Sequence, residues 1–131
     1  MAIEAPLCFE YLYRDASNYK IFGSVVLRGR CGQDLEGVLR ARFQDGVYFI
    51  PEQIKIPPLQ NKIEKYNENF PTEDDHVWHE FSGLRVLSVE GVSEDEYSVE
   101  VDDLIAALDL VEKWEESSSA LYESLYCRAF C

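Results

Sequence analysis

The sequence predicts an α+β domain, in which an antiparallel sheet of three or four strands carries helices on one face. Three observations predict it. Apolar and polar residues alternate in two stretches near the N-terminus and in one beyond residue 75. Apolar residues recur at helical spacing after residues 33 and 100. These elements are segregated, roughly in the order β-β-α-β-α-α, rather than strictly alternating, which is typical of α+β folds.

The first predicted element is a β-hairpin formed by residues 7–15 and 20–29. The polar turn between the strands contains Asp15 and Asn18, which are frequent turn formers. In the first strand, one face is expected to carry the alternating residues Leu7, Phe9, Tyr11 and Tyr13.

A helix is predicted within residues 33–46, where apolar residues recur at helical spacing. Gly46 marks its end. Residues 47–59 are broken by prolines and predict a short extended piece with a helical turn after Pro51. The polar residues 60–75 predict a long loop.

Residues 76–91 predict a long strand, or two strands with a bulge at Gly83. In a strand, His76 falls with Trp78 and Glu80, whereas His79 falls with Val77 and Phe81. The two histidines then point to opposite faces and share no metal ion. The residues that make up the two faces are His76, Val77, Trp78, His79, Glu80 and Phe81.

Residues 92–100 are expected to be an acidic connector, and residues 101–116 the clearest helix. Residues 117–119 mark a break, and residues 120–131 a last short helix. The expected core residues are Tyr11, Val25, Leu39, Leu104, Ile105 and Leu108.

A chain of 131 residues with 47% hydrophobic residues is expected to form one domain, residues 1–131. No apolar run is long enough to span a membrane, and no signal peptide is apparent, so the expected location is the cytoplasm. The cysteines fit that location as free thiols, because their spacing matches no zinc module. They are Cys8, Cys31, Cys127 and Cys131.

The charge is strongly one-sided. Residues 1–60 are neutral, whereas residues 61–131 carry the whole net charge of −13. Such a field disfavours direct binding to nucleic acid and to anionic membranes, and it favours a basic protein partner. The expected partner-binding residues are Glu73, Asp74, Asp75, Glu94, Asp95 and Glu96, with a hairpin rim of Tyr13, Arg14 and Tyr19.

Catalytic signals are weak. A catalytic pair of His76 with the carboxylate of Glu80 or Asp74 is one interpretation. The alternative is that these residues only begin a strand. There is no nucleophile elbow and no phosphate-binding glycine loop. No catalytic residue, metal or cofactor is therefore predicted.

Three segments carry a resemblance: "YLYRDASNYKIFGSVVL", "FIPEQIKIPPLQ" and "PTEDDHVWHEF". The chain resembles a group of small uncharacterised bacterial and phage proteins that share such segments. The resemblance covers about the first 90 residues. It implies a bacterial or phage origin, but it implies no activity and no site residue.

The expected function is non-enzymatic binding of a basic, nucleic-acid-handling protein, as immunity proteins and phage inhibitors of host defence do. Carboxylates would stand in for phosphates in a cationic cleft. One alternative is a small metal-dependent hydrolase centred on residues 73–80. Another is a homodimer or a subunit of a larger assembly.

Overall fold

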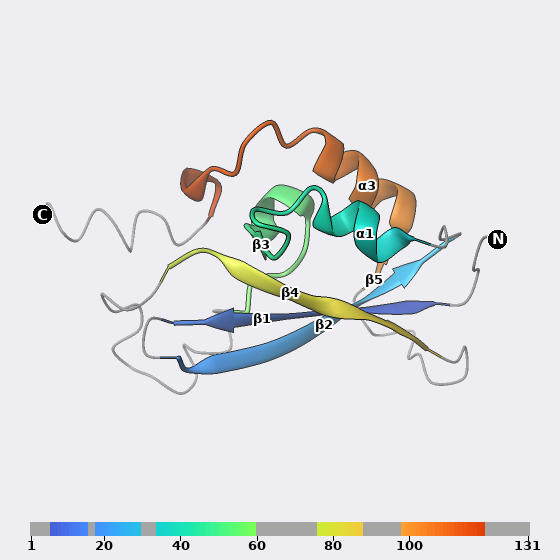
Figure 1. Ribbon diagram of the computed structural model, residues 1–131, viewed down its shortest axis with the longest axis horizontal. Helices are drawn as coiled ribbons and strands as arrows, with labels where there is room; N and C mark the ends of the chain where they lie inside the picture. The colour runs from blue at the N-terminus through green and yellow to red at the C-terminus, as the bar shows by residue number, and fades with distance from the viewer. Residues whose placement is uncertain (1–5, 16–17, 30–33, 60–75, 88–97, 120–131) are drawn as a thin grey trace, which may run out of the picture.

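The chain forms a strongly curved sheet with short helices over its concave side (Figure 1). The computed structural model describes residues 6–15, 18–29, 34–59, 76–87 and 98–119. The clusters Glu73–Asp75 and Glu94–Glu96 and the expected last helix over 120–131 lie outside these residues. Three of the cysteines lie outside them too, whereas Cys8 is a buried free thiol.

Three long strands form the centre of the sheet. The predicted hairpin is confirmed, because β1 (Leu7–Arg14) pairs antiparallel with β2 (Lys20–Arg28). The third strand, β4 (His79–Val86), pairs antiparallel with the other edge of β1. The predicted bulge is present, since Glu10 pairs with Gly83 but Tyr11 pairs with Phe81. Gly83 adopts φ 154°, which a side-chain-bearing residue rarely takes.

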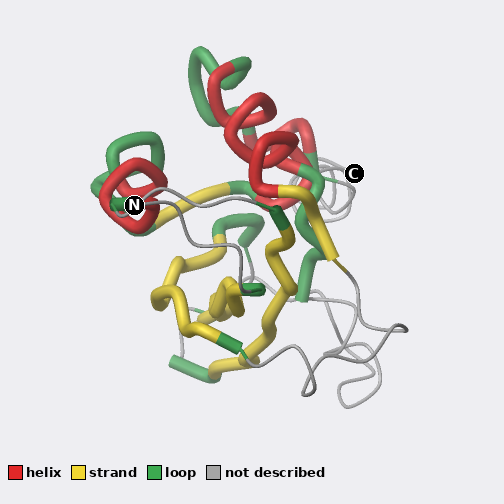
Figure 2. Tube along the Cα trace, turned by 90° about the vertical axis from the view of Figure 1, so that its right-hand side faces the viewer, coloured by secondary structure: helices red, strands yellow, loops and turns green. Residues whose placement is uncertain are grey.

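Two short strands extend the sheet to the order β3-β4-β1-β2-β5. β3 (Tyr48–Phe49) pairs with β4, and β5 (Ser98–Glu100) pairs with the end of β2 in parallel. The expected antiparallel sheet of three or four strands is therefore wrong. The sheet is mixed, has five strands and curls into half a barrel (Figure 2). Residues 98–100 were expected to be a connector, but backbone pairing to β2 makes them a strand.

Helices contribute less than the sequence predicts, so the fold is mostly β rather than α+β. α1 (Leu35–Arg40) and the 3₁₀ turns η1 (Pro51–Ile54) and η3 (Glu116–Ser118) are short. α3 (Val101–Asp109) is the only described helix of more than two turns. It ends at Asp109 instead of continuing to residue 116. No helix in the described ranges is long and apolar enough to cross a membrane.

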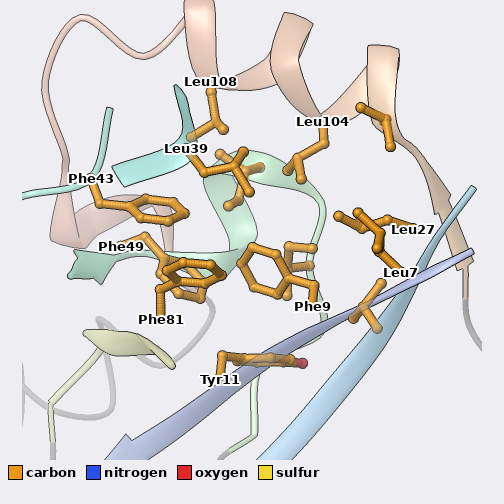
Figure 3. Close-up of a cluster of buried hydrophobic side chains, with 14 of the residues drawn as sticks. Leu7, Phe9, Tyr11, Leu27, Leu39, Phe43, Phe49, Phe81, Leu104 and Leu108 are labelled. Carbon is orange, nitrogen blue, oxygen red and sulfur yellow. The ribbon is translucent and has the colours of Figure 1, made fainter. Parts of the chain in front are cut away.

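The core lies between the concave side of the sheet and these helices (Figure 3). Its centre is aromatic: the Phe9 ring lies 4.9 Å from Phe81 and 5.8 Å from Phe49. Five of the expected core residues are buried, and Ile105 is half-buried at the edge of the core. The four alternating residues of β1 all belong to the core, as their period of two predicts, whereas Cys8 and Leu12 are buried on the other face.

Candidate functional site

His79 is a structural residue of the core. Its ring is fully buried, and it lies 5.5 Å from the Tyr13 ring and 6.1 Å from the Phe49 ring. Its Nδ1–H donates to the Val77 carbonyl over 3.3 Å, and its Nε2 accepts the Leu59 N–H over 3.0 Å. Burial lowers the pKa of His79 from 6.5 to about 3, because the charged imidazole would lose its hydration. His79 is therefore neutral at pH 7.

His76 lies on the side of the chain opposite to His79, together with Trp78 and Glu80. Its Nε2–H donates to the Arg14 carbonyl over 2.6 Å, and its Nδ1 accepts the Trp78 N–H over 3.0 Å. Within residues 76–81, only Val77, His79 and Phe81 are buried. This confirms the prediction that Trp78 faces away from their side. No group of three or more His, Cys, Asp or Glu in the described part of the chain could hold a metal ion.

The three residues of the predicted hairpin rim do not form one exposed surface. Tyr13 is fully buried and therefore cannot be part of an exposed rim, which corrects its assignment. Arg14 pairs with Glu80, with Nε 2.9 Å from one carboxylate oxygen, and it also donates to Asn18. Tyr19 is 55% exposed and follows Asn18, which adopts φ 68° in the turn. Of these three, Tyr19 alone is exposed as expected.

A surface hollow of about 740 Å³ lies between η1, α3 and the segment after it. Its apolar lining comes from the end of α3 and the next turn, and it includes Leu110, which is 83% exposed. Its polar lining includes three carboxylates, two lysines and an amide. These lining residues are Gln53, Lys55, Asp103, Ala106, Ala107, Leu110, Val111, Glu112, Lys113 and Glu115. We call this site the Leu110 hollow.

Two further hollows lie around Trp78, which lines both of them. One, of about 530 Å³, is also lined by Trp114, Arg42 and Lys113. The other, of about 320 Å³, is lined by Gln44, Tyr48, His76 and Trp78. The two tryptophan rings meet edge to face at 6.4 Å. The 530 Å³ hollow shares residues 111–113 with the Leu110 hollow and Gln44 and Trp78 with the smallest hollow, so it adjoins both.

The segment from Leu110 to Ser119 is held to the body by side-chain hydrogen bonds. The Gln53 amide donates to the Lys113 carbonyl over 3.3 Å and accepts the Glu115 N–H over 2.7 Å. Trp78 Nε1–H donates to Glu116 over 3.2 Å. Gln53 thus binds backbone groups of the segment that follows α3 and that is no longer helical.

The surroundings of these hollows are acidic. Residues 98–119 contain seven Asp or Glu and one Lys, which leaves a net charge of −6. The lysine, Lys113, lies 3.9 Å from Glu115, and the nearby Arg42 pairs with Asp109 at 2.7 Å. The lining of the Leu110 hollow itself has three carboxylates against Lys55 and Lys113, so most of the negative charge lies around the hollow rather than in it.

Sequence reasoning missed this site because it assigned residues 101–116 to one helix. On a continuous helix Val111 belongs to the buried stripe. The signal that could have revealed the site is Leu110, because on a continuous helix this apolar residue falls on the face opposite to Leu104 and Leu108.

Comparison with known proteins found no match to a family model, to a curated protein or to a solved structure. The resemblance to small bacterial and phage proteins stays a prediction.

Proposed function

We propose that this chain is a non-enzymatic protein that binds a basic protein partner. The observation that carries the proposal is the Leu110 hollow, in which exposed apolar side chains lie beside three carboxylates and two lysines within an acidic segment. The acidic clusters Glu73–Asp75 and Glu94–Glu96 add to the negative charge of the same half of the sequence.

The two features of the hollow have different roles in binding. A leucine that is 83% exposed beside apolar neighbours offers area whose burial by a partner stabilises a complex. The carboxylates of Asp103, Glu112 and Glu115 attract a basic surface, which raises the association rate and selects against acidic partners. A partner that handles nucleic acid fits this chemistry, since its cationic cleft can accept carboxylates in place of phosphates.

Selection of peptides from a random display library on the immobilised protein tests the proposal. We expect the selected peptides to combine Lys or Arg with apolar side chains and to lose affinity as the salt concentration rises. Leu110→Asp should abolish their binding. Val86→Asp is the matched control, because Val86 is also an exposed aliphatic residue, at 61%, but lines none of the three hollows.

Two results would overturn the proposal. One is the selection of peptides without a basic bias. The other is equal loss of binding in the Leu110→Asp and Val86→Asp variants, which would place the binding surface elsewhere.

A further inference from the structure

His76 connects the end of β1 to the segment that leads into β4. The backbone N–H of His76 donates to the Tyr13 hydroxyl over 3.1 Å, and the two rings lie 5.1 Å apart. The His76 Nε2–H donates to the Arg14 carbonyl over 2.6 Å, and Nδ1 accepts the backbone N–H of Trp78 over 3.0 Å. One ring nitrogen is therefore a donor and the other an acceptor, which is the pattern of a neutral imidazole.

The two bonds of the ring differ in their response to protonation. A protonated imidazole carries a hydrogen on both nitrogens, so it has two donors and no acceptor. The bond from Nε2 to the Arg14 carbonyl is kept, and the positive charge strengthens it. The bond to Trp78 is lost, because two N–H groups then point at each other. Protonation of His76 thus acts on Trp78 and leaves the attachment to β1 in place.

The second histidine of the chain does not respond in this way. The sequence contains two histidines, and histidine is the side chain that ordinarily changes its charge between about pH 5 and pH 8. Burial lowers the pKa of His79 to about 3, so His79 stays neutral throughout that range. A change in the charge of an imidazole in this range is therefore a change at His76.

Other titratable and charged groups from four elements surround the His76 ring. They are Tyr13 and Arg14 of β1, Tyr48 of β3, Glu80 of β4 and, through its bond to the Trp78 indole, Glu116 of η3. Arg14 and Glu80 pair over 2.9 Å, so their charges offset each other. All of these groups remain when His76 itself is replaced, and comparison with His76 variants therefore removes their contributions.

Trp78 is the residue through which His76 affects the surface. Its side chain lines both the hollow of about 530 Å³ and that of about 320 Å³, and its ring meets Trp114 edge to face at 6.4 Å. Trp78 is fixed at two points, by its backbone N–H on His76 and by its indole N–H on Glu116. Loss of the first bond lets the backbone of Trp78 move, which changes the shape of both hollows.

We propose that His76 is a proton switch, which holds the backbone of Trp78 while it is neutral and releases it when it is protonated. The two hollows that Trp78 lines have their described shape while His76 is neutral, and they are altered once it is charged. The inference does not rest on the proposed function, because it concerns the position of Trp78 and not the partner that uses these hollows.

NMR of the full-length, isotope-labelled chain from about pH 8 to pH 5 tests the switch. The ring signals of His76 report its protonation, and the backbone amide of Trp78 reports the hydrogen bond. We expect both to change together, with one midpoint. The hydrogen-exchange protection of the Trp78 amide should fall about tenfold across the transition, which is the change expected for one lost hydrogen bond.

Two variants separate the hydrogen bond from the charge. In His76→Asn the side-chain oxygen can accept the N–H two residues later, as in an Asx turn, but it does not titrate. The Trp78 amide of this variant should stay protected over the whole pH range. His76→Leu has no acceptor, so its Trp78 amide should be about tenfold less protected at every pH.

Three results would overturn the inference. They are a His76 ring that stays neutral down to pH 5, a Trp78 amide that stays protected while His76 is charged, and a pH dependence that persists in His76→Asn. If neither variant folds, the wild-type titration decides alone, because it follows His76 and Trp78 in one molecule. These outcomes are distinct from failure of the proposed function, which peptide selection tests through Leu110.

Discussion

The backbone N–H of Leu59 donates a hydrogen bond of 3.0 Å to Nε2 of His79, and both residues are buried. This bond joins the end of the proline-rich stretch to the first residue of β4. The acceptor nitrogen must be unprotonated, so the bond exists only while His79 is neutral.

The first prediction follows from this bond and concerns pH. The pKa of His79 falls from 6.5 in the unfolded chain to about 3 in the fold, so the unfolded chain binds more protons between these values. The contribution of His79 to stability is therefore complete above pH 6.5 and is lost as the pH falls toward 3. Within this range the free energy of unfolding should decline by about 1.4 kcal/mol per pH unit on account of His79.

The variant His79→Gln isolates this contribution, because it removes the titration while all carboxylates and His76 remain. Urea unfolding at pH 6.5 and pH 5 should show the difference between wild type and variant shrinking by roughly 2 kcal/mol. A difference that stays constant with pH would contradict the assignment of a neutral, buried His79.

The second prediction compares a leucine within α3 with the leucine that directly follows the helix. Leu104→Ala should lower the free energy of unfolding by about 2–5 kcal/mol, because Leu104 is fully buried and the change leaves a cavity. Leu110→Ala should change it by less than about 0.5 kcal/mol, because that side chain is exposed. Thermal or chemical unfolding measures both. Similar losses in the two variants would mean that α3 packs differently.

The third prediction concerns the amide of Gln53. Gln53→Ala removes both hydrogen bonds to the backbone of Lys113 and Glu115. We expect the free energy of unfolding to fall by at most about 2 kcal/mol. Hydrogen exchange of the Glu115 amide should accelerate. Gln44→Ala serves as the control, since the Gln44 side chain has no hydrogen-bond partner among the described residues. Unchanged exchange at Glu115 would show that Gln53 does not hold this segment.

The fourth prediction concerns the carboxylates of the Leu110 hollow. Changing Glu112 and Glu115 to lysine should slow association with a selected basic peptide and flatten its dependence on salt, while the fold survives. Stopped-flow or surface kinetics at low and high salt measure this. The control is the double variant Glu10→Lys, Asp34→Lys. It changes the net charge by the same amount, at residues that line none of the three hollows. Equal slowing in both pairs would indicate a general effect of net charge.

The sequence by itself determined which face of β1 joins the hydrophobic core, although Cys8 and Leu12 of the other face are buried too. Leu7, Phe9 and Tyr11 alternate along β1, and their burial follows from the period of two that strand geometry imposes. The turn at Asn18 and the bulge at Gly83 were also predictable, because they depend on the backbone preferences of single residues.

Only the tertiary structure decided the fifth strand, the end of α3 and the candidate site. β5 pairs with β2 through backbone groups that every residue carries, so its side chains give no sign of it. α3 ends at Asp109, and the segment after it is bound through the backbone of Lys113 and Glu115 to Gln53, which lies far away in the sequence. Trp78 and Trp114 meet for the same reason: contacts between distant segments depend on how the whole chain packs, which no local pattern encodes.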